Sequence, residues 1–192
     1  MKEYETDHKT FIGGWYMPED VCDQVLNFFN DQKLFHKPGI TGAEKKEIVE
    51  VKKCTQMDII PDAKELNLYN VHLKLILDTY KQKYRYADHV NYYAITENMS
   101  VQHYKPGEGY YEWHMENDGH RHTMYRHLVF MTYLNDVENG GTEFLYFPDL
   151  NIQARKGLTL IWPAGWTHTH RGVVSNVDEK YITTGWFSFY DK

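Results

Sequence analysis

The sequence predicts a mainly β protein in which flanking helices near the amino terminus support a jelly-roll barrel, the cupin-like double-stranded β-helix. Two patterns predict this fold. Apolar residues at helical spacing dominate the first third, and short β-prone runs separated by turn residues fill the rest. A chain of 192 residues can bury one core, so we expect residues 1–192 to form a single domain. Residues 1–90 should be a helix-rich support region and residues 91–192 the jelly-roll core.

Two segments of the first ninety residues have the spacing of amphipathic helices. The run from Pro18 to Phe29 carries apolar side chains three and four positions apart, and its proline suits a first helical turn. Asp31 to Gly42 contains Pro38-Gly39 and should be a loop. The second helix should be longer and lie against a sheet. Its apolar positions are Leu66, Tyr69, Leu73, Ile76, Leu77 and Tyr80.

From about Asn91 onward, β-prone runs recur at a spacing of roughly 8–12 residues, which favours a sandwich or barrel over parallel βαβ units. Turn residues separate the runs, as in Glu138-Asn139-Gly140-Gly141. The expected strands are Ser100–Tyr104, Tyr110–Glu116, Arg126–Leu134, Thr142–Tyr146, Leu158–Trp162, Thr167–Val174 and Tyr181–Phe189.

Composition argues against several classes of partner. The net charge of −6 gives no electrostatic reason to expect nucleic-acid binding. The Lys45-Lys46 and Lys52-Lys53 pairs alternate with acidic residues and should form a solvated face. No apolar stretch approaches the length of a membrane span, so no membrane partner is expected. Nothing in the sequence specifies an oligomeric state.

Cysteine usage points to a reducing compartment. The chain has 2 cysteines, Cys22 and Cys54, which lie in unrelated contexts and form no Cys-x-x-Cys pair. The first residues, Met1 to Lys9, lack the apolar core of a signal peptide. We therefore expect a cytoplasmic protein with free thiols.

A candidate metal site begins at His114-Met115-Glu116. Side chains at positions i and i+2 of an extended strand share one face, so His114 and Glu116 could bind one ion together. His170 would supply a third ligand from a later strand, and a jelly roll brings such strands together at one mouth. Two imidazoles and one carboxylate on one side of an ion are the ligand set of non-haem Fe(II) enzymes that activate oxygen.

A longer ordered pattern surrounds these residues. The run from Tyr133 to Phe144 resembles the Tyr-Leu-Asn-Asp-Val-x-x-Gly-Gly-x-Thr-x-Phe stretch of prolyl 4-hydroxylases, within the 2-oxoglutarate- and Fe(II)-dependent dioxygenases. The resemblance continues through the Arg155-Lys156-Gly157 turn. It ends with His170-Arg171-Gly172, with Lys180 ten residues after His170, and with Thr184-Gly185-Trp186-Phe187. It covers roughly residues 99 to 190.

The resemblance implies a role for each matching residue. His114, Glu116 and His170 match the iron ligands, and Lys180 matches the residue that pairs with the distal carboxylate of 2-oxoglutarate. Three aromatic residues complete the match: Tyr133 helps to hold that carboxylate, Tyr104 lines the site near cosubstrate and substrate, and Trp186 lies on the closing strand. The implied cofactors are Fe(II), 2-oxoglutarate and O2, with ascorbate as a reductant.

Lys180 also stands out without the resemblance. It begins the β-prone run Lys-Tyr-Ile-Thr-Thr-Gly-Trp, and its same-face neighbours are Ile182, Thr184 and Trp186. A lysine buried in such a row needs an anion, because an unpaired buried charge is costly. The alternative is a charged strand end that reaches solvent.

Two features leave alternatives open. His168 and His170 would face the same way on a strand, so either could be the third ligand. Pro163-x-Gly165-x-x-His168 resembles the second metal motif of cupins. The His-x-Gly context and the ten-residue step to Lys180 favour His170 as the ligand. Prolyl hydroxylases usually carry His-x-Asp, whereas this chain has His-x-Glu. The longer arm of Glu116 leaves iron binding intact but puts the substrate in question.

The resemblance implies an enzyme that hydroxylates an unactivated C–H bond and converts 2-oxoglutarate to succinate and CO2. A prolyl residue of a protein or peptide is the first substrate class to expect, and a free amino acid or small metabolite is the second. The alternative from another class is a cupin-like metal-binding barrel that uses no 2-oxoglutarate.

Overall fold

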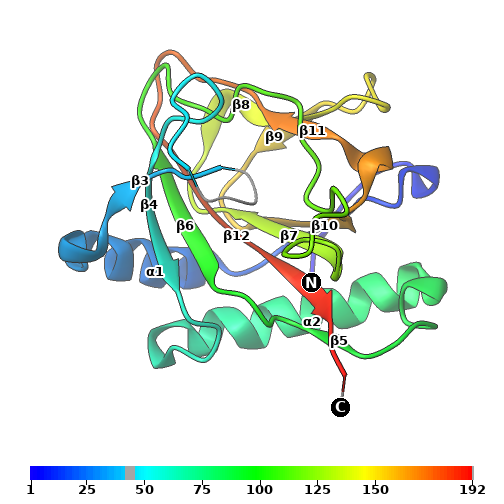
Figure 1. Ribbon diagram of the computed structural model, residues 1–192. Coiled ribbons are helices and arrows are strands. Elements are labelled where there is room, and N and C mark those ends of the chain that lie inside the picture. The colour runs from blue at the N-terminus through cyan, green and yellow to red at the C-terminus, as the bar shows by residue number, and fades with distance from the viewer. Residues whose placement is uncertain (42–45, 192) are drawn as a thin grey trace.

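Two antiparallel β-sheets face each other in the computed structural model, and the helices lie outside the larger sheet (Figure 1). The structure describes residues 1–41 and 46–191. Gly42 and Lys45, which the sequence places in a loop and on a solvated face, lie outside the described residues. The β-rich, jelly-roll architecture predicted from strand spacing is confirmed.

The large sheet combines strands from the first ninety residues with strands from the rest of the chain. Its strand order is β1-β2-β10-β7-β12-β6-β4-β3, and the short β5 pairs with the end of β12. Strands from the first ninety residues form both edges, so this region contributes to the sheet as well as supporting it. The bounds are β1 Glu3–Tyr4, β2 Gly13–Tyr16, β3 Lys37–Pro38, β4 Thr55–Ile59, β5 Tyr93–Ala94, β6 Met99–Tyr104, β7 Arg126–Tyr133, β10 Leu158–Pro163 and β12 Lys180–Phe189.

The small sheet has the order β11-β8-β9, with β8 at Val137–Phe144, β9 at Ile152–Ala154 and β11 at His170–Gly172. The prediction of a turn at Glu138–Gly141 is wrong, because these residues lie inside β8. They form an irregularity there: the β8–β9 register shifts between Val137 and Thr142, and Asn139 has a positive φ of 53°. The turn-forming residues therefore produce a bulge within one strand.

Both expected helices are present, as α1 Glu19–Asp31 and α2 Asn67–Lys83. Their apolar faces are buried against the large sheet on the side away from the small sheet (Figure 1). This layer includes Val25 and Phe29 of α1, Leu73 and Ile76 of α2, and Met57 of β4. Short 3₁₀ helices connect the elements: η1 His8–Thr10, η2 Lys33–Phe35, η3 Lys64–Leu66, η4 Arg85–Ala87 and η5 Trp166–His168.

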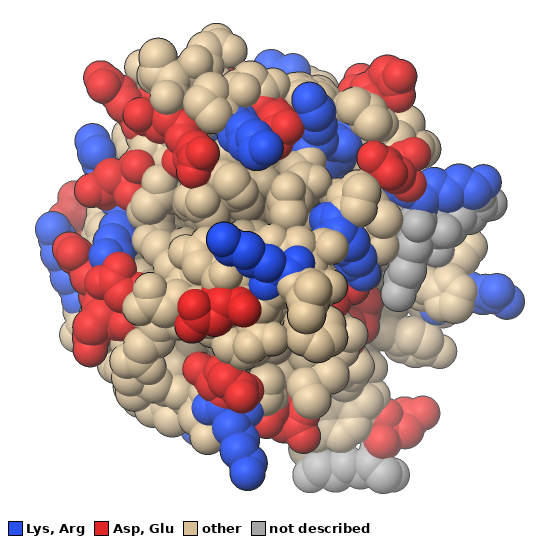
Figure 2. Space-filling view, turned by 90° about the vertical axis from the view of Figure 1, so that its left-hand side faces the viewer, with Lys and Arg blue, Asp and Glu red and all other residues tan. Residues whose placement is uncertain are grey.

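A second core lies between the two sheets. Phe144, Ile152, Trp162 and Val129 belong to it, and all are nearly inaccessible to solvent. Within the described part of the chain, no helix is long and apolar enough to span a membrane. On the face shown in Figure 2, basic and acidic side chains alternate, and neither sign forms a continuous patch.

The strand expected over Tyr110–Glu116 is absent, and the segment is irregular. Its backbone forms hydrogen bonds with three different segments. The Tyr111 amide donates to the Val51 oxygen, and the Glu116 amide donates to the Ala164 oxygen. Between them, His114 and His170 each donate to the other's backbone oxygen. Since these partners belong to different parts of the barrel, no continuous ladder forms. This crossing segment runs from a contact with Val51, shortly before β4 of the large sheet, to a contact with His170 in β11 of the small sheet.

Candidate metal and cosubstrate site

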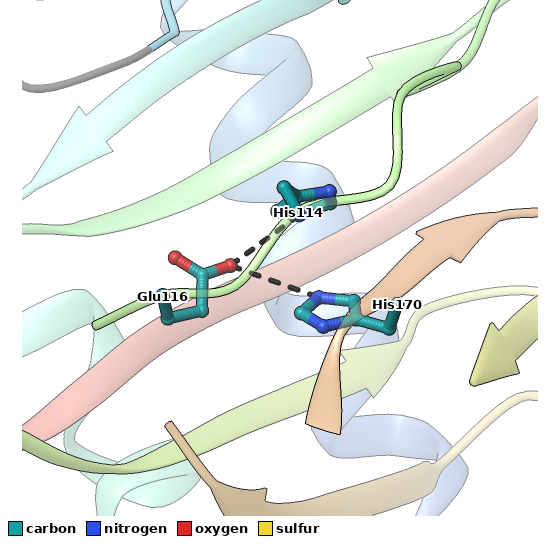
Figure 3. A group of neighbouring side chains, drawn as sticks. All are labelled: His114, Glu116 and His170. Atoms are coloured by element: carbon teal, nitrogen blue, oxygen red, sulfur yellow. Dashed lines mark ion pairs between the residues drawn. The ribbon is translucent and has the colours of Figure 1, made fainter. Parts of the chain in front are cut away.

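Three predicted ligands, His114, Glu116 and His170, converge on one another (Figure 3). His114 and Glu116 come from the crossing segment, and His170 begins β11 of the small sheet. The paired hydrogen bonds between the backbones of His114 and His170, at 2.9 and 3.0 Å, hold the two segments together. One nitrogen or oxygen atom from each side chain lies within 4.8 Å of those of the others.

Each imidazole is oriented by a backbone carbonyl. His114 Nδ1 lies 3.0 Å from the Glu112 oxygen, and His170 Nδ1 lies 3.0 Å from the His168 oxygen. A carbonyl can only accept, so each Nδ1 carries a proton, and each Nε2 is turned toward Glu116. Burial, followed by the nearby His114, lowers the pKa of His170 to about 3. The His170 imidazole is therefore neutral at physiological pH.

The two carboxylate oxygens of Glu116 have different surroundings. Oε2 accepts a hydrogen bond of 2.9 Å from Trp186 Nε1 and lies 3.4 Å from the Arg126 guanidinium. Oε1 faces the two imidazoles, 3.6 Å from His114 Nε2 and 3.7 Å from His170 Nε2. Burial alone would raise the pKa of Glu116, but His114, His170 and Arg126 together lower it to about 2. The carboxylate is ionised.

These three side chains fit a divalent metal ion. Two imidazole nitrogens and one carboxylate oxygen face one another, and when both imidazoles are neutral their lone pairs repel unless a cation lies between them. All three are held from behind by hydrogen bonds to Nδ1 or Oε2, the arrangement typical of metal ligands. Among residues 1–41 and 46–191, they are the one group of three or more His, Cys, Asp or Glu side chains so arranged.

His168 lies elsewhere. It ends the 3₁₀ helix η5, so its side chain does not share a face with that of His170, and its Nε2 lies 2.8 Å from the backbone oxygen of Thr10. The ring is buried among Phe144 and Phe147. His168 therefore joins the amino-terminal segment to the barrel. The strand expected over Thr167–Val174 is correct only for its central part.

The three predicted ligands line a cavity of about 770 Å³ between the sheets. This volume is in the range of small-molecule binding sites. Four other predicted residues line the same cavity: Tyr104, Tyr133, Lys180 and Trp186. The inward-facing row on β12 is also as expected, because Ile182 and Thr184 line the cavity with Lys180.

Lys180 is 4% exposed and lies deep in this cavity. Its ammonium donates to the backbone oxygens of Gly140 and Val173, at 3.0 and 2.6 Å, and lies 5.4 Å from the centre of the Tyr104 ring. Its partners in the described chain are neutral, and burial lowers the pKa of Lys180 to about 8. A carboxylate from a small molecule would supply the missing counter-charge.

The two tyrosines lie on β6 and β7, the strands on either side of β12 in the large sheet. The Tyr133 hydroxyl pairs with Thr142 Oγ1 at 2.5 Å, and the Tyr104 hydroxyl donates to Gln102 Oε1 at 2.6 Å. Trp186 instead contacts the Glu116 carboxylate, so the indole supports a predicted ligand. This contact was not predicted from the sequence, nor was the role of Arg126, whose guanidinium lies 3.4 Å from the centre of the Trp186 ring. The position of Arg126 could have indicated its role, because it is a charged residue at the start of an apolar strand.

The expectation that Lys52 is solvated is wrong. It is 5% exposed and lines the cavity, whereas the side chain of its neighbour Lys53 is 55% exposed. Lys52 is buried because its backbone bridges to Tyr110, a contact between distant parts of the sequence. No local pattern could have indicated it.

Known proteins share both the sequence pattern and the fold. Residues 99–188 match the family model of the 2OG-Fe(II) oxygenase superfamily. No curated protein matches the chain by sequence. Among solved structures, the chain is similar to a viral collagen prolyl hydroxylase from Paramecium Bursaria Chlorella virus-1, with a TM-score of 0.67 and 17% identity over 94% of this chain and 97% of the other.

Two further prolyl hydroxylases have similar folds. One is a prolyl-4-hydroxylase from Pseudomonas putida, with a TM-score of 0.67 and 14% identity over 94% of this chain and 93% of the other. The other is a prolyl hydroxylase from Trichoplax adhaerens in complex with a fragment of hypoxia inducible factor, with a TM-score of 0.70 and 16% identity over 93% and 84%. At these identities the likeness concerns the fold. Together with the matched segment of residues 99–188, it supports an enzyme of the 2-oxoglutarate-dependent dioxygenase class with a prolyl hydroxylase-like fold.

Proposed function

We propose that this enzyme hydroxylates an unactivated C–H bond of a prolyl residue in a protein or peptide, with conversion of 2-oxoglutarate to succinate and CO2. One observation carries the proposal: a His-Glu-His cluster and the buried, charge-unpaired Lys180 line one cavity. A metal-binding barrel without a 2-oxo acid would have no use for that ammonium.

In this proposal His114, Glu116 and His170 hold Fe(II) through Nε2, Oε1 and Nε2. Bound iron with 2-oxoglutarate and O2 supplies the oxidising chemistry. Lys180 pairs with the distal carboxylate of 2-oxoglutarate, and the Tyr133 hydroxyl, now paired with Thr142, turns to the same group. Tyr104 lies beside the Lys180 ammonium and lines the site near cosubstrate and prime substrate. Trp186 and Arg126 keep Oε1 of Glu116 directed at the metal.

Peptidyl proline is proposed because the structural neighbours include prolyl hydroxylases, one of them in complex with a peptide fragment. A free amino acid or small metabolite is the second candidate, since Glu116 in place of the usual aspartate puts peptidyl proline in question. Ascorbate is proposed as the reductant that keeps iron ferrous, and it belongs in every assay.

A cytoplasmic location is also proposed, since Cys22 and Cys54 are free thiols. A fluorescent fusion found in another compartment would refute this location.

Lys180→Ala tests the proposed cosubstrate site. The wild-type protein with Fe(II), ascorbate and 2-oxoglutarate should form succinate slowly even without prime substrate. Lys180→Ala should raise the 2-oxoglutarate concentration required by about 10- to 100-fold, because it removes a charge-assisted hydrogen bond. Lys156→Ala is a matched control, since Lys156 pairs with Asp23 outside the cavity. Unchanged turnover in Lys180→Ala, or no succinate from the wild-type protein, would refute the dioxygenase site.

A further inference from the structure

A second buried ammonium lies in the cavity, on the wall formed by β4 and β6. Lys52 precedes β4, and its Nζ donates to Gln56 Oε1 at 3.2 Å. The ammonium also lies 5.7 Å from the centre of the Tyr110 ring, which stacks on His114 with ring centres 3.6 Å apart. Lys52 is therefore one aromatic ring away from the proposed metal.

The nearest carboxylates are already engaged. Asp58 pairs with Lys37 at 2.6 Å and accepts from Gln56 Nε2 at 2.9 Å. Glu116 is committed to the metal site, and its charge is neutralised when a cation binds there. In the described chain, Lys52 makes no ion pair within 4.0 Å, and its one side-chain hydrogen-bond partner is a neutral amide.

The Gln56 amide is fixed in one orientation. Its nitrogen donates to Asp58, so its oxygen must face Lys52 and the backbone amide of Ile40, 3.2 Å away. This arrangement holds the Lys52 ammonium in place but leaves its charge uncompensated. Burial lowers the pKa of Lys52, whereas Cys54, Glu116 and Asp58 act to raise it. An ammonium held in a cavity in this way is suited to an anionic ligand.

We propose that Lys52, oriented by Gln56, binds a carboxylate of the prime substrate. The inference rests on the proposed function and narrows its substrate to molecules that carry a carboxylate near the oxidised carbon. Lys180 would anchor the cosubstrate and Lys52 the substrate, so the cavity has one ammonium for each. The carboxylate could be the α-carboxylate of a free amino acid or an acidic side chain near a prolyl residue of a peptide.

Paired probes that differ only in charge test this assignment. Protein loaded with Mn(II) and 2-oxoglutarate under anaerobic conditions is titrated calorimetrically with free and N-acetylated amino acids, and with their primary amides. A second arm uses proline-containing peptides with Glu or Gln beside the proline. At least one acid should bind about 10- to 100-fold more tightly than its amide. The arm in which the preference appears identifies the source of the carboxylate.

Lys52→Met should abolish the preference for the acid, and Lys52→Arg should keep part of it. Lys53→Met is the matched control, because Lys53 is largely exposed and pairs with Glu108. Lys52→Met should fold with an equal or higher Tm, since an apolar side chain replaces an uncompensated charge. In Lys53→Met, the preference for the acid, uncoupled succinate formation and the requirement for 2-oxoglutarate should all stay at wild-type values.

Other outcomes of these experiments would overturn either the role of Lys52 or the proposed function. Binding of none of the acids, equal binding of acids and amides, or an unchanged preference in Lys52→Met would overturn the role of Lys52. A 2-oxoglutarate requirement that rises in Lys52→Met as it does in Lys180→Ala would also overturn it, because Lys52 would then hold the cosubstrate. Failure of the wild-type protein to form succinate would instead refute the proposed function.

Discussion

Two buried lysines, Lys52 and Lys180, line the cavity, and neither makes an ion pair with a carboxylate of the described chain. The sequence indicated that Lys180 needs an anion because its strand neighbours face inward, and the structure buries it beside two carbonyls. Lys52 has the same property but was missed, because its burial depends on a bridge to Tyr110. Strand alternation is readable from local sequence, whereas a contact between distant irregular segments is not.

The protonation of Lys180 should make the binding of 2-oxoglutarate depend on pH. Because the pKa of the free site is lowered to about 8, the ammonium is present below pH 8 and is lost as the pH rises above it. Binding of the distal carboxylate favours the ammonium and raises its pKa. The Kd of 2-oxoglutarate should therefore increase about tenfold between pH 7 and pH 9, as measured by anaerobic titration of the Mn(II)-loaded protein.

A shorter 2-oxo acid separates this effect from titration at the metal. 2-Oxobutyrate shares the metal-binding end of 2-oxoglutarate but lacks the distal carboxylate, so its Kd should not show the rise assigned to Lys180. A Kd of 2-oxoglutarate that stays constant from pH 7 to pH 9, or an equal rise for both acids, would contradict the role of Lys180.

At the scale of elements, the long central strands of the large sheet were predicted well, and the irregular segments were not. β6, β7, β10 and β12 lie close to their expected positions. β4 was not predicted as a strand because Gln56 faces the cavity while Met57 faces the helices, so a polar lining conceals an interior strand. The Tyr110–Glu116 segment was wrongly predicted as a strand, yet its candidate ligands still converge, because one pair of hydrogen bonds aligns His114 with His170.

Gly141 allows β8 and β9 to approach closely at the bulge. A Cβ atom at this position would lie 1.6 Å from the Ile152 backbone oxygen, so the two backbones would have to separate. Gly141→Ala should lower the free energy of unfolding by about 3 kcal/mol, as measured by urea denaturation. It should also weaken 2-oxoglutarate binding, because the adjacent Thr142 positions the Tyr133 hydroxyl.

Gly165→Ala is the matched control for this prediction. No atom lies within 4 Å of a Cβ built at Gly165, and its φ of −79° suits any residue. Its free energy of unfolding should stay within about 0.5 kcal/mol of the wild-type value. Equal stability of the two variants would show that the β8–β9 contact is not needed at the bulge.

At the scale of the whole molecule, the site joins parts of the fold that are otherwise connected only by loops and packing. His114 and Glu116 lie on the crossing segment, and His170 lies on the small sheet. Lys180 extends from the large sheet to carbonyls of Gly140 and Val173 beside the small one. A bound metal and cosubstrate should therefore stabilise the whole barrel, since ligands that bind only the folded state shift the unfolding equilibrium.

The matched pair His168→Ala and His170→Ala tests this linkage and the choice of ligand together. At 100 times its Kd, Mn(II) should stabilise the wild-type protein by about 2.7 kcal/mol and raise the Tm by about 5–10 °C. His170→Ala should lose most of this increase, because it removes a proposed ligand. His168→Ala should unfold at a lower temperature without metal, since it loses the hydrogen bond to Thr10, yet keep the increase with Mn(II). If His168→Ala lost the increase and His170→Ala kept it, the metal would have to bind through His168, as in the cupin-like alternative.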